Sequence, residues 1–64
     1  GIKAEIMEFM ADGAMHTVTE IMKNVASLAG ASNQKATSLV RQLVYDDKML
    51  VRVEVKGRAM FHKA

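Results

Sequence analysis

The spacing of the apolar residues changes once along this chain, and that change most constrains the fold. Up to about residue 45 the apolar residues recur every three or four positions, which is the period of an amphipathic helix. After Asp46 and Asp47 the stretch MLVRVEVKG alternates valines with charged residues, and Gly57 separates it from a second stretch, RAMFHK. Alternation of this kind is typical of a half-buried strand. The sequence therefore predicts helices first and a β-hairpin last.

Two helices are predicted before Gly30. Residues 2–11 repeat apolar side chains at helical spacing, and Gly13 follows as a residue free to adopt a positive φ. Thr17 and Glu20 then have the spacing of a capping box, in which the hydroxyl and the carboxylate each accept from a free backbone N–H. A second helix is therefore predicted to start at Thr17, and the chain is predicted to turn at Gly30.

The stretch SNQKATSLVRQL, residues 32–43, predicts a third helix with an unusual exposed side. Ser32 is its predicted N-cap. At 100° per residue the apolar residues cluster on one side: Ala36, Leu39, Val40 and Leu43. The opposite side carries side chains that can hydrogen-bond base edges, where a surface helix usually carries Glu and Lys: Asn33, Gln34, Thr37, Ser38, Arg41 and Tyr45.

The order of these elements predicts an α+β fold of three helices and a two-stranded hairpin, with a very short third strand near Met15–Thr17. With 64 residues the chain is interpreted as a single domain, residues 1–64. It has no cysteine, no apolar run of membrane-spanning length and no charged-then-apolar leader, so we expect a cytoplasmic protein that does not enter a membrane.

From TVTEIM through AGASNQKATSLVRQLVYDDKMLVRVEVKGRAMF the chain resembles the winged helix-turn-helix family of small bacterial, archaeal and phage regulators. The resemblance covers nearly the whole chain. The positions that fit the family are Ile21, Gly30, Ser32, Ala36, Val40 and Leu43. It implies that the third helix is the recognition helix and the hairpin is the wing. The family usually has Gly after an acidic residue at the exit from the recognition helix. Here Asp47 stands in that place, and a left-handed Asp would cost roughly 1 kcal/mol.

Charge is unevenly distributed along the chain, although the net charge is only +2. Residues 1–32 carry two lysines against four acidic residues, a net charge of −2, whereas residues 33–64 carry seven Lys and Arg against three acidic residues, a net charge of +4. Such asymmetry is typical of a surface that meets a polyanion, but a few charges can also segregate by chance in a short chain.

Patterns that would indicate catalysis or a metal site are missing. His16 and His62 are the only imidazoles, and without cysteine a zinc site would need carboxylates around them that the spacing does not provide. Asp46 and Asp47 are neighbours whose side chains diverge, and LAGAS lacks the lysine of a phosphate-binding loop. The six methionines are interpreted mostly as core fillers rather than as a binding groove. We predict a non-enzyme with no cofactor and no metal.

The resemblance implies that the third helix enters the major groove of DNA, where amides can pair with adenine and Arg41 with guanine or a phosphate. The predicted contacts on this helix are Ser32, Asn33, Gln34, Lys35, Thr37, Ser38 and Arg41. The predicted contacts on the wing are Arg52, Lys56, Gly57, Arg58 and Lys63. Lysines on a strand also protect an exposed edge from pairing, which is the alternative interpretation of the wing charges.

The predicted function is sequence-specific binding of double-stranded DNA by a small transcriptional regulator, which would be associated with the nucleoid. One such domain covers only a few base pairs, so a homodimer or a larger parent chain is expected to supply specificity. The alternative is a winged-helix protein-interaction module that docks on a larger nucleic-acid-processing or assembly partner through the acidic residues Glu5, Glu8 and Asp12. Binding of structured RNA is a third interpretation.

Overall fold

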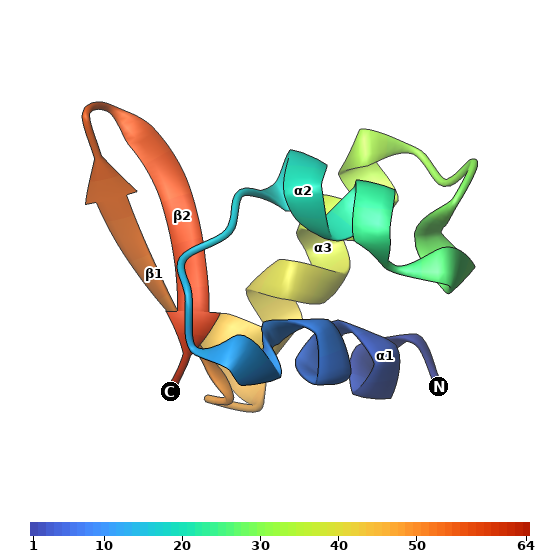
Figure 1. Ribbon diagram of the computed structural model, residues 1–64, viewed down its shortest axis with the longest axis horizontal. Helices are drawn as coiled ribbons and strands as arrows, with labels where there is room; N and C mark the ends of the chain where they lie inside the picture. The colour runs from blue at the N-terminus through green and yellow to red at the C-terminus, as the bar shows by residue number, and fades with distance from the viewer.

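The computed structural model describes all 64 residues and has the predicted α+β fold class, with a winged-helix layout. Three helices pack together and a two-stranded antiparallel hairpin stands at one end of the helical body (Figure 1). The elements are α1 (Ile2–Phe9), η1 (Met10–Asp12), α2 (Val18–Asn24), η2 (Ala26–Leu28), α3 (Asn33–Arg41), η3 (Gln42–Asp46), β1 (Leu50–Val55) and β2 (Arg58–Lys63). No helix combines the length and the apolar character needed to cross a lipid bilayer.

One apolar core joins the helices to the hairpin. Its ten buried residues are all hydrophobic: Ile6, Met10, Ile21, Val25, Leu28, Ala36, Val40, Leu43, Leu50 and Phe61. Met10 is fully buried in this core, and the half-buried Met7 and Met22 pack against it, whereas Met15 and Met49 are each 46% exposed. Leu50 and Phe61 anchor the hairpin because they are the buried side chains of β1 and β2.

Local capping signals start α2 and α3 where the sequence predicts. The N–H of Thr17 donates to Oε1 of Glu20 at 2.9 Å and the N–H of Glu20 donates to Oγ1 of Thr17 at 3.2 Å, which completes the capping box. Oγ of Ser32 accepts from the N–H of Lys35 at 3.1 Å. Each cap satisfies N–H groups that the first helical turn leaves free. The predictions for Thr17 and Ser32 are therefore confirmed.

The exit from α3 differs from the expectation. The N–H of Asp47 donates to the carbonyl oxygen of Gln42 at 2.9 Å, five residues back, so η3 is a π-type turn that accommodates one extra residue. Asp47 keeps a right-handed φ of −88°, and the left-handed residue is Lys48, with φ of 55°. The prediction that Asp47 takes the left-handed position is therefore wrong by one residue.

The valines of β1 do not face the core. Antiparallel pairing places Arg52 opposite Phe61 and Leu50 opposite Lys63, so Arg52 shares the face of the two buried hairpin residues. Side chains alternate along a strand, and the valines therefore lie on the other face, where Val51 is 38% exposed. The predicted half-buried, alternating strand is present, with Val53 and Val55 half-buried, but its buried anchor Leu50 lies on the face of Arg52 and Glu54.

A single bridge supplies the predicted third strand. The N–H of His16 donates to the carbonyl oxygen of Phe61 at 2.8 Å, and the N–H of Phe61 donates to that of His16 at 2.8 Å. This bridge fastens β2 to the segment that enters α2. It therefore fixes the position of the hairpin relative to the helices.

Candidate nucleic-acid interface

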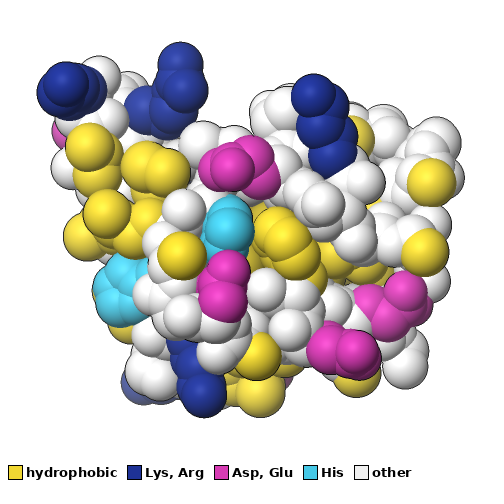
Figure 2. Space-filling model, viewed as in Figure 1, with side chains coloured by type: hydrophobic (Ala, Val, Ile, Leu, Met, Phe, Trp, Pro, Cys, Tyr) yellow, Lys and Arg dark blue, Asp and Glu magenta, His cyan; other side chains and the backbone are white.

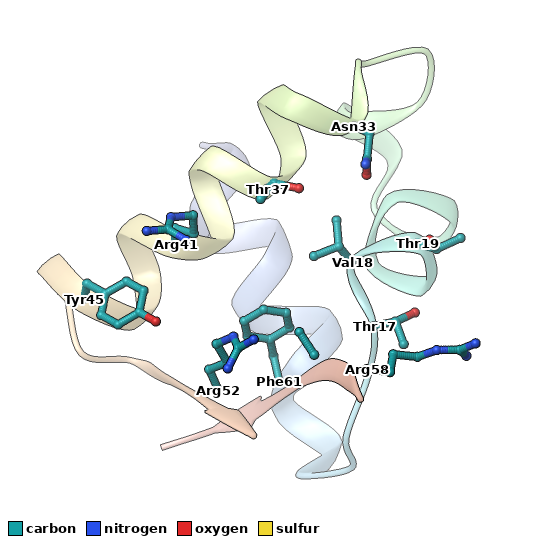
Figure 3. Close-up of a pocket in the computed structure, with 11 residues that line it drawn as sticks. Thr17, Val18, Thr19, Asn33, Thr37, Arg41, Tyr45, Arg52, Arg58 and Phe61 are labelled. Carbon is teal, nitrogen blue, oxygen red and sulfur yellow. The ribbon is translucent and has the colours of Figure 1, made fainter. Parts of the chain in front are cut away.

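A groove of about 660 Å³ separates α3 and the start of α2 from the hairpin. In Figure 3 the side chains of α3 line one wall, those of the hairpin line the opposite wall, and α2 closes one side. The lining residues are Thr17, Val18, Thr19, Asn33, Thr37, Arg41, Tyr45, Arg52, Arg58, Ala59 and Phe61. They come from segments far apart in the sequence, and the bridge between His16 and Phe61 brings those segments together.

The wall formed by α3 and its continuation η3 is a stripe of residues at four-residue spacing. Asn33, Thr37, Arg41 and Tyr45 follow one another along it (Figure 3). Residues four apart lie on one side of a helix, which is why the stripe forms. The guanidinium carbon of Arg41 lies 5.4 Å from the ring centroid of Tyr45, within the range of a cation–π contact. This contact restrains the guanidinium along the helix, and it gives Tyr45 a role that the predicted contacts did not include.

The hairpin wall is cationic. Arg52 and Arg58 line it together with the apolar Ala59 and Phe61, and the groove includes no carboxylate among its lining residues. The nearest acidic partner is Glu54, whose Oε2 lies 3.9 Å from Nη2 of Arg52. An exposed pair at that separation leaves the arginine available to a phosphate, because such pairs contribute little free energy in water. The charged side chains that line the groove are therefore all positive: Arg41, Arg52 and Arg58.

The outer side of α3 is hollowed as well. A depression of about 560 Å³ lies there, lined by Gln34, Thr37, Ser38, Arg41, Gln42, Tyr45 and Asp46. Thr37, Arg41 and Tyr45 line both hollows, so they form the ridge between them. Every predicted contact on α3 is exposed except Thr37, which is half-buried. The polar face of α3 is therefore turned outward and is not masked by the hairpin.

The hairpin tip is also cationic. Lys56, with φ of 53°, and Gly57, with φ of 77°, form a two-residue turn between the paired Val55 and Arg58. Figure 2 shows Lys and Arg side chains gathered at this free end of the hairpin, with hydrophobic side chains below them. The tip thus extends the positive surface beyond the groove.

Seven of the twelve predicted contacts lie outside the groove: Ser32, Gln34, Lys35, Ser38, Lys56, Gly57 and Lys63. Of these, Gln34 and Ser38 line the second hollow. Lys63 is paired with Leu50 at the base of the hairpin, at the opposite end from the Lys56–Gly57 turn. Lys35 lines neither hollow, although it is exposed in the first turn of α3. β2 therefore carries Lys63 away from the groove and the tip, and its contact with DNA stays a prediction.

The start of α2 was not predicted as part of this site. Thr17, Val18 and Thr19 reach the groove only through the long-range bridge of the preceding residue, His16, to β2. The spacing of residues along the sequence does not indicate that His16 pairs with Phe61. The hydroxyl of Thr17 is already engaged in its cap, so Thr19 offers the free hydroxyl on this side.

Acidic residues surround the bridge on the side of η1 and α2. Nε2 of His16 lies 3.1 Å from Oδ2 of Asp12, and its ring packs on Phe9 with centroids 4.5 Å apart. The pKa of Asp12 is lowered because the N–H of Ala14 donates to its carboxylate and His16 is hydrogen-bonded to it. The N–H of Thr17 lowers the pKa of Glu20 in the same way. No three His, Cys, Asp or Glu side chains are placed to hold a metal ion.

Comparisons with protein-family models, with curated proteins and with solved structures found no match to this chain.

Proposed function

We propose that this chain is a winged helix-turn-helix protein that binds double-stranded DNA sequence-specifically, as a non-enzymatic transcriptional regulator. The observation that carries the proposal is the groove. Its α3 wall presents outward-facing amide, hydroxyl and guanidinium groups, its hairpin wall presents Arg52 and Arg58, and no carboxylate lies between them. Base readout and phosphate binding require these two kinds of group side by side.

The dimensions of α3 suit the major groove of DNA. A nine-residue helix is roughly 13 Å long and about 10–12 Å wide with its side chains, and the major groove is about 12 Å wide. Asn33 and Gln34 lie in the first turn, where an amide can make two hydrogen bonds to adenine. Arg41 lies two turns further on, so we assign it to a guanine edge, with Tyr45 limiting its freedom before binding.

The hairpin then holds the sugar–phosphate backbone. Arg52 and Arg58 face phosphates beside the groove, and Lys56 at the tip reaches the backbone or the adjoining minor groove. Together with Lys35 these cations make about four phosphate contacts, for which the slope of log K against log salt is about −3.6.

The experiment is a titration of labelled duplexes selected from a random library, at two salt concentrations, with three single variants. Arg41→Ala is expected to weaken the selected duplex by about 1–3 kcal/mol and to relax its sequence preference. Arg58→Ala is expected to weaken all duplexes alike and to reduce the salt slope by about 0.9. Lys63→Ala is the matched control, because it removes one positive charge from the base of the same hairpin, away from both the groove and the tip, and should leave the slope unchanged.

Absence of duplex binding at low salt would refute the proposal, as would a Lys63→Ala effect equal to that of Arg58→Ala. The first result would favour docking on a protein partner. That alternative is supported by an acidic surface, a shallow hollow of about 330 Å³. Its lining residues are Glu5, Glu8, Phe9, Asn24, Val25 and Ala26. Titration of an RNA duplex under the same conditions tests the third interpretation, binding of structured RNA.

A further inference from the structure

Strand β1 has a free edge. The sheet has only two strands, and the far edge of β2 is taken by the bridge to His16. Figure 1 shows β1 as the outermost strand of the molecule, with no other element beside its free side. Such an edge presents unpaired N–H and C=O groups that can accept another strand.

The hydrogen bonds on β2 show which residues of β1 point their backbone groups outward. Phe61 exchanges both of its backbone bonds with His16, away from β1. Its partner Arg52 therefore points its own N–H and C=O away from β2, and by alternation Leu50 and Glu54 do the same. The backbone groups of Leu50, Arg52 and Glu54 form no hydrogen bonds to turns, loops or other elements either. Arg52 and Glu54 are thus the unpaired centre of the edge.

The sequence of this edge is complementary to itself. Val51-Arg52-Val53-Glu54-Val55 reads valine, cation, valine, anion, valine, so reversing the strand exchanges the two charges about Val53. We propose that β1 pairs antiparallel with β1 of a second copy of this chain, centred on Val53. Arg52 of each copy then lies opposite the partner's Glu54, and four backbone hydrogen bonds form between these residues.

Charge selects this register over its neighbours. Residues whose backbone N–H and C=O groups point outward can pair only with residues of the same kind on the partner strand. The nearest alternative registers are therefore centred on Arg52 or on Glu54 instead of Val53. The first alternative places two Arg52 side chains opposite one another, and the second places two Glu54 side chains opposite one another. Like charges directly opposite across strands are destabilising, whereas opposite charges are stabilising. Charged residues usually discourage edge pairing, but this order of signs favours one symmetric pairing.

The side chains of both residues are available for it. Arg52 is 42% exposed and Glu54 is 63% exposed at the side chain, and the 3.9 Å between their charged atoms within one chain confirms that both lie on one face. The other face would join Val51 to the partner's Val55 and Val53 to the partner's Val53 across the new interface. That contact extends the apolar surface of the hairpin into a four-stranded sheet.

The test is sedimentation equilibrium of the chain and of two charge-reversal variants, from roughly 10 µM to 1 mM, since an edge-to-edge interface this small is expected to be weak. The wild-type mass should rise from 7.0 kDa toward twice that value. Arg52→Glu and Glu54→Arg should each raise the dissociation constant at least about tenfold, because two cross-strand pairs per dimer turn repulsive. An equimolar mixture of the two variants should associate again, because each reversed charge then meets an opposite one.

The doubly exchanged chain, Arg52→Glu with Glu54→Arg, should also recover self-association in the absence of DNA. Circular dichroism of each variant at low concentration checks that the fold is kept, and both substitutions lie on an exposed edge. A wild-type mass that stays at 7.0 kDa up to 1 mM would overturn the inference. Equal association of wild type and single variants, or no recovery in the mixture, would overturn it as well. None of these outcomes depends on DNA binding.

Discussion

The corner between η3 and β1 offers a test of the backbone itself, through Gly and Ala substitutions at two adjacent positions. Lys48 has φ of 55°, where an L-residue costs roughly 1–2 kcal/mol more than glycine does. Asp47 has φ of −88°, which any residue adopts. The two positions should therefore respond to glycine in opposite directions.

The magnitude follows from two opposing effects. Glycine has more freedom to lose on folding, which disfavours it by roughly 0.5–1 kcal/mol relative to alanine in an ordinary conformation. At Lys48 relief of the left-handed conformation exceeds this loss, so the glycine variant should be more stable than the alanine variant by about 0.5–1 kcal/mol. At Asp47 only the loss remains, so the alanine variant should be more stable by a similar amount.

Comparing Gly with Ala at one position removes the same native side chain in both variants, so the change in charge cancels. Thermal unfolding followed by circular dichroism is a suitable assay. An unfolding entropy of about 2.1 cal/mol/K per residue gives roughly 0.13 kcal/mol/K for 64 residues, so each pair should differ in Tm by about 5 °C. A glycine variant that is the more stable of the pair at position 47 would refute the π-type turn and restore the register that the sequence predicts.

Two further predictions concern the start of α2 and the bridge beside it. Thr17→Ala removes the cap and should lower the free energy of unfolding by about 0.5–2 kcal/mol, measured by urea denaturation; no change would refute the cap's contribution. The lowered pKa of Asp12 means that its ionised form stabilises the fold above the ordinary carboxyl range, and that this stability is lost as pH falls through the lowered value. Asp12→Asn should therefore destabilise the chain at neutral pH and lose that difference in acid, as followed by denaturation at several pH values.

Features set by neighbouring residues were predictable from the sequence. The capping box of Thr17 and Glu20 and the cap of Ser32 each need only a hydrogen bond within three residues, so the sequence contains all the information that defines them. The exposed face of α3 was equally readable, because helical spacing separates its polar residues from its apolar ones. Tyr45 was readable in the same way, through its four-residue spacing from Arg41.

Features set by distant residues were not predictable. The π-type turn places Asp47 within 2.8 Å of Nζ of Lys3, a residue 44 positions away. Alternation in β1 defines two faces but not which of them meets the helices. That choice is made by Leu50 and Phe61, which fill the core and turn Val51 outward.

Symmetry connects the proposed DNA contacts with the proposed pairing of β1. Two antiparallel strands that keep equivalent side chains on one face are related by a two-fold axis perpendicular to the sheet. Arg52 and Phe61 line the groove from one face of the hairpin, so both grooves and both α3 helices would lie on the same side of the four-stranded sheet. A dimer of this kind reads a palindromic duplex, because operator symmetry mirrors protein symmetry. If the selected duplexes bind a single chain and contain no palindrome, the proposed role of α3 in reading bases stands. The proposed pairing of β1 with a second copy is then refuted.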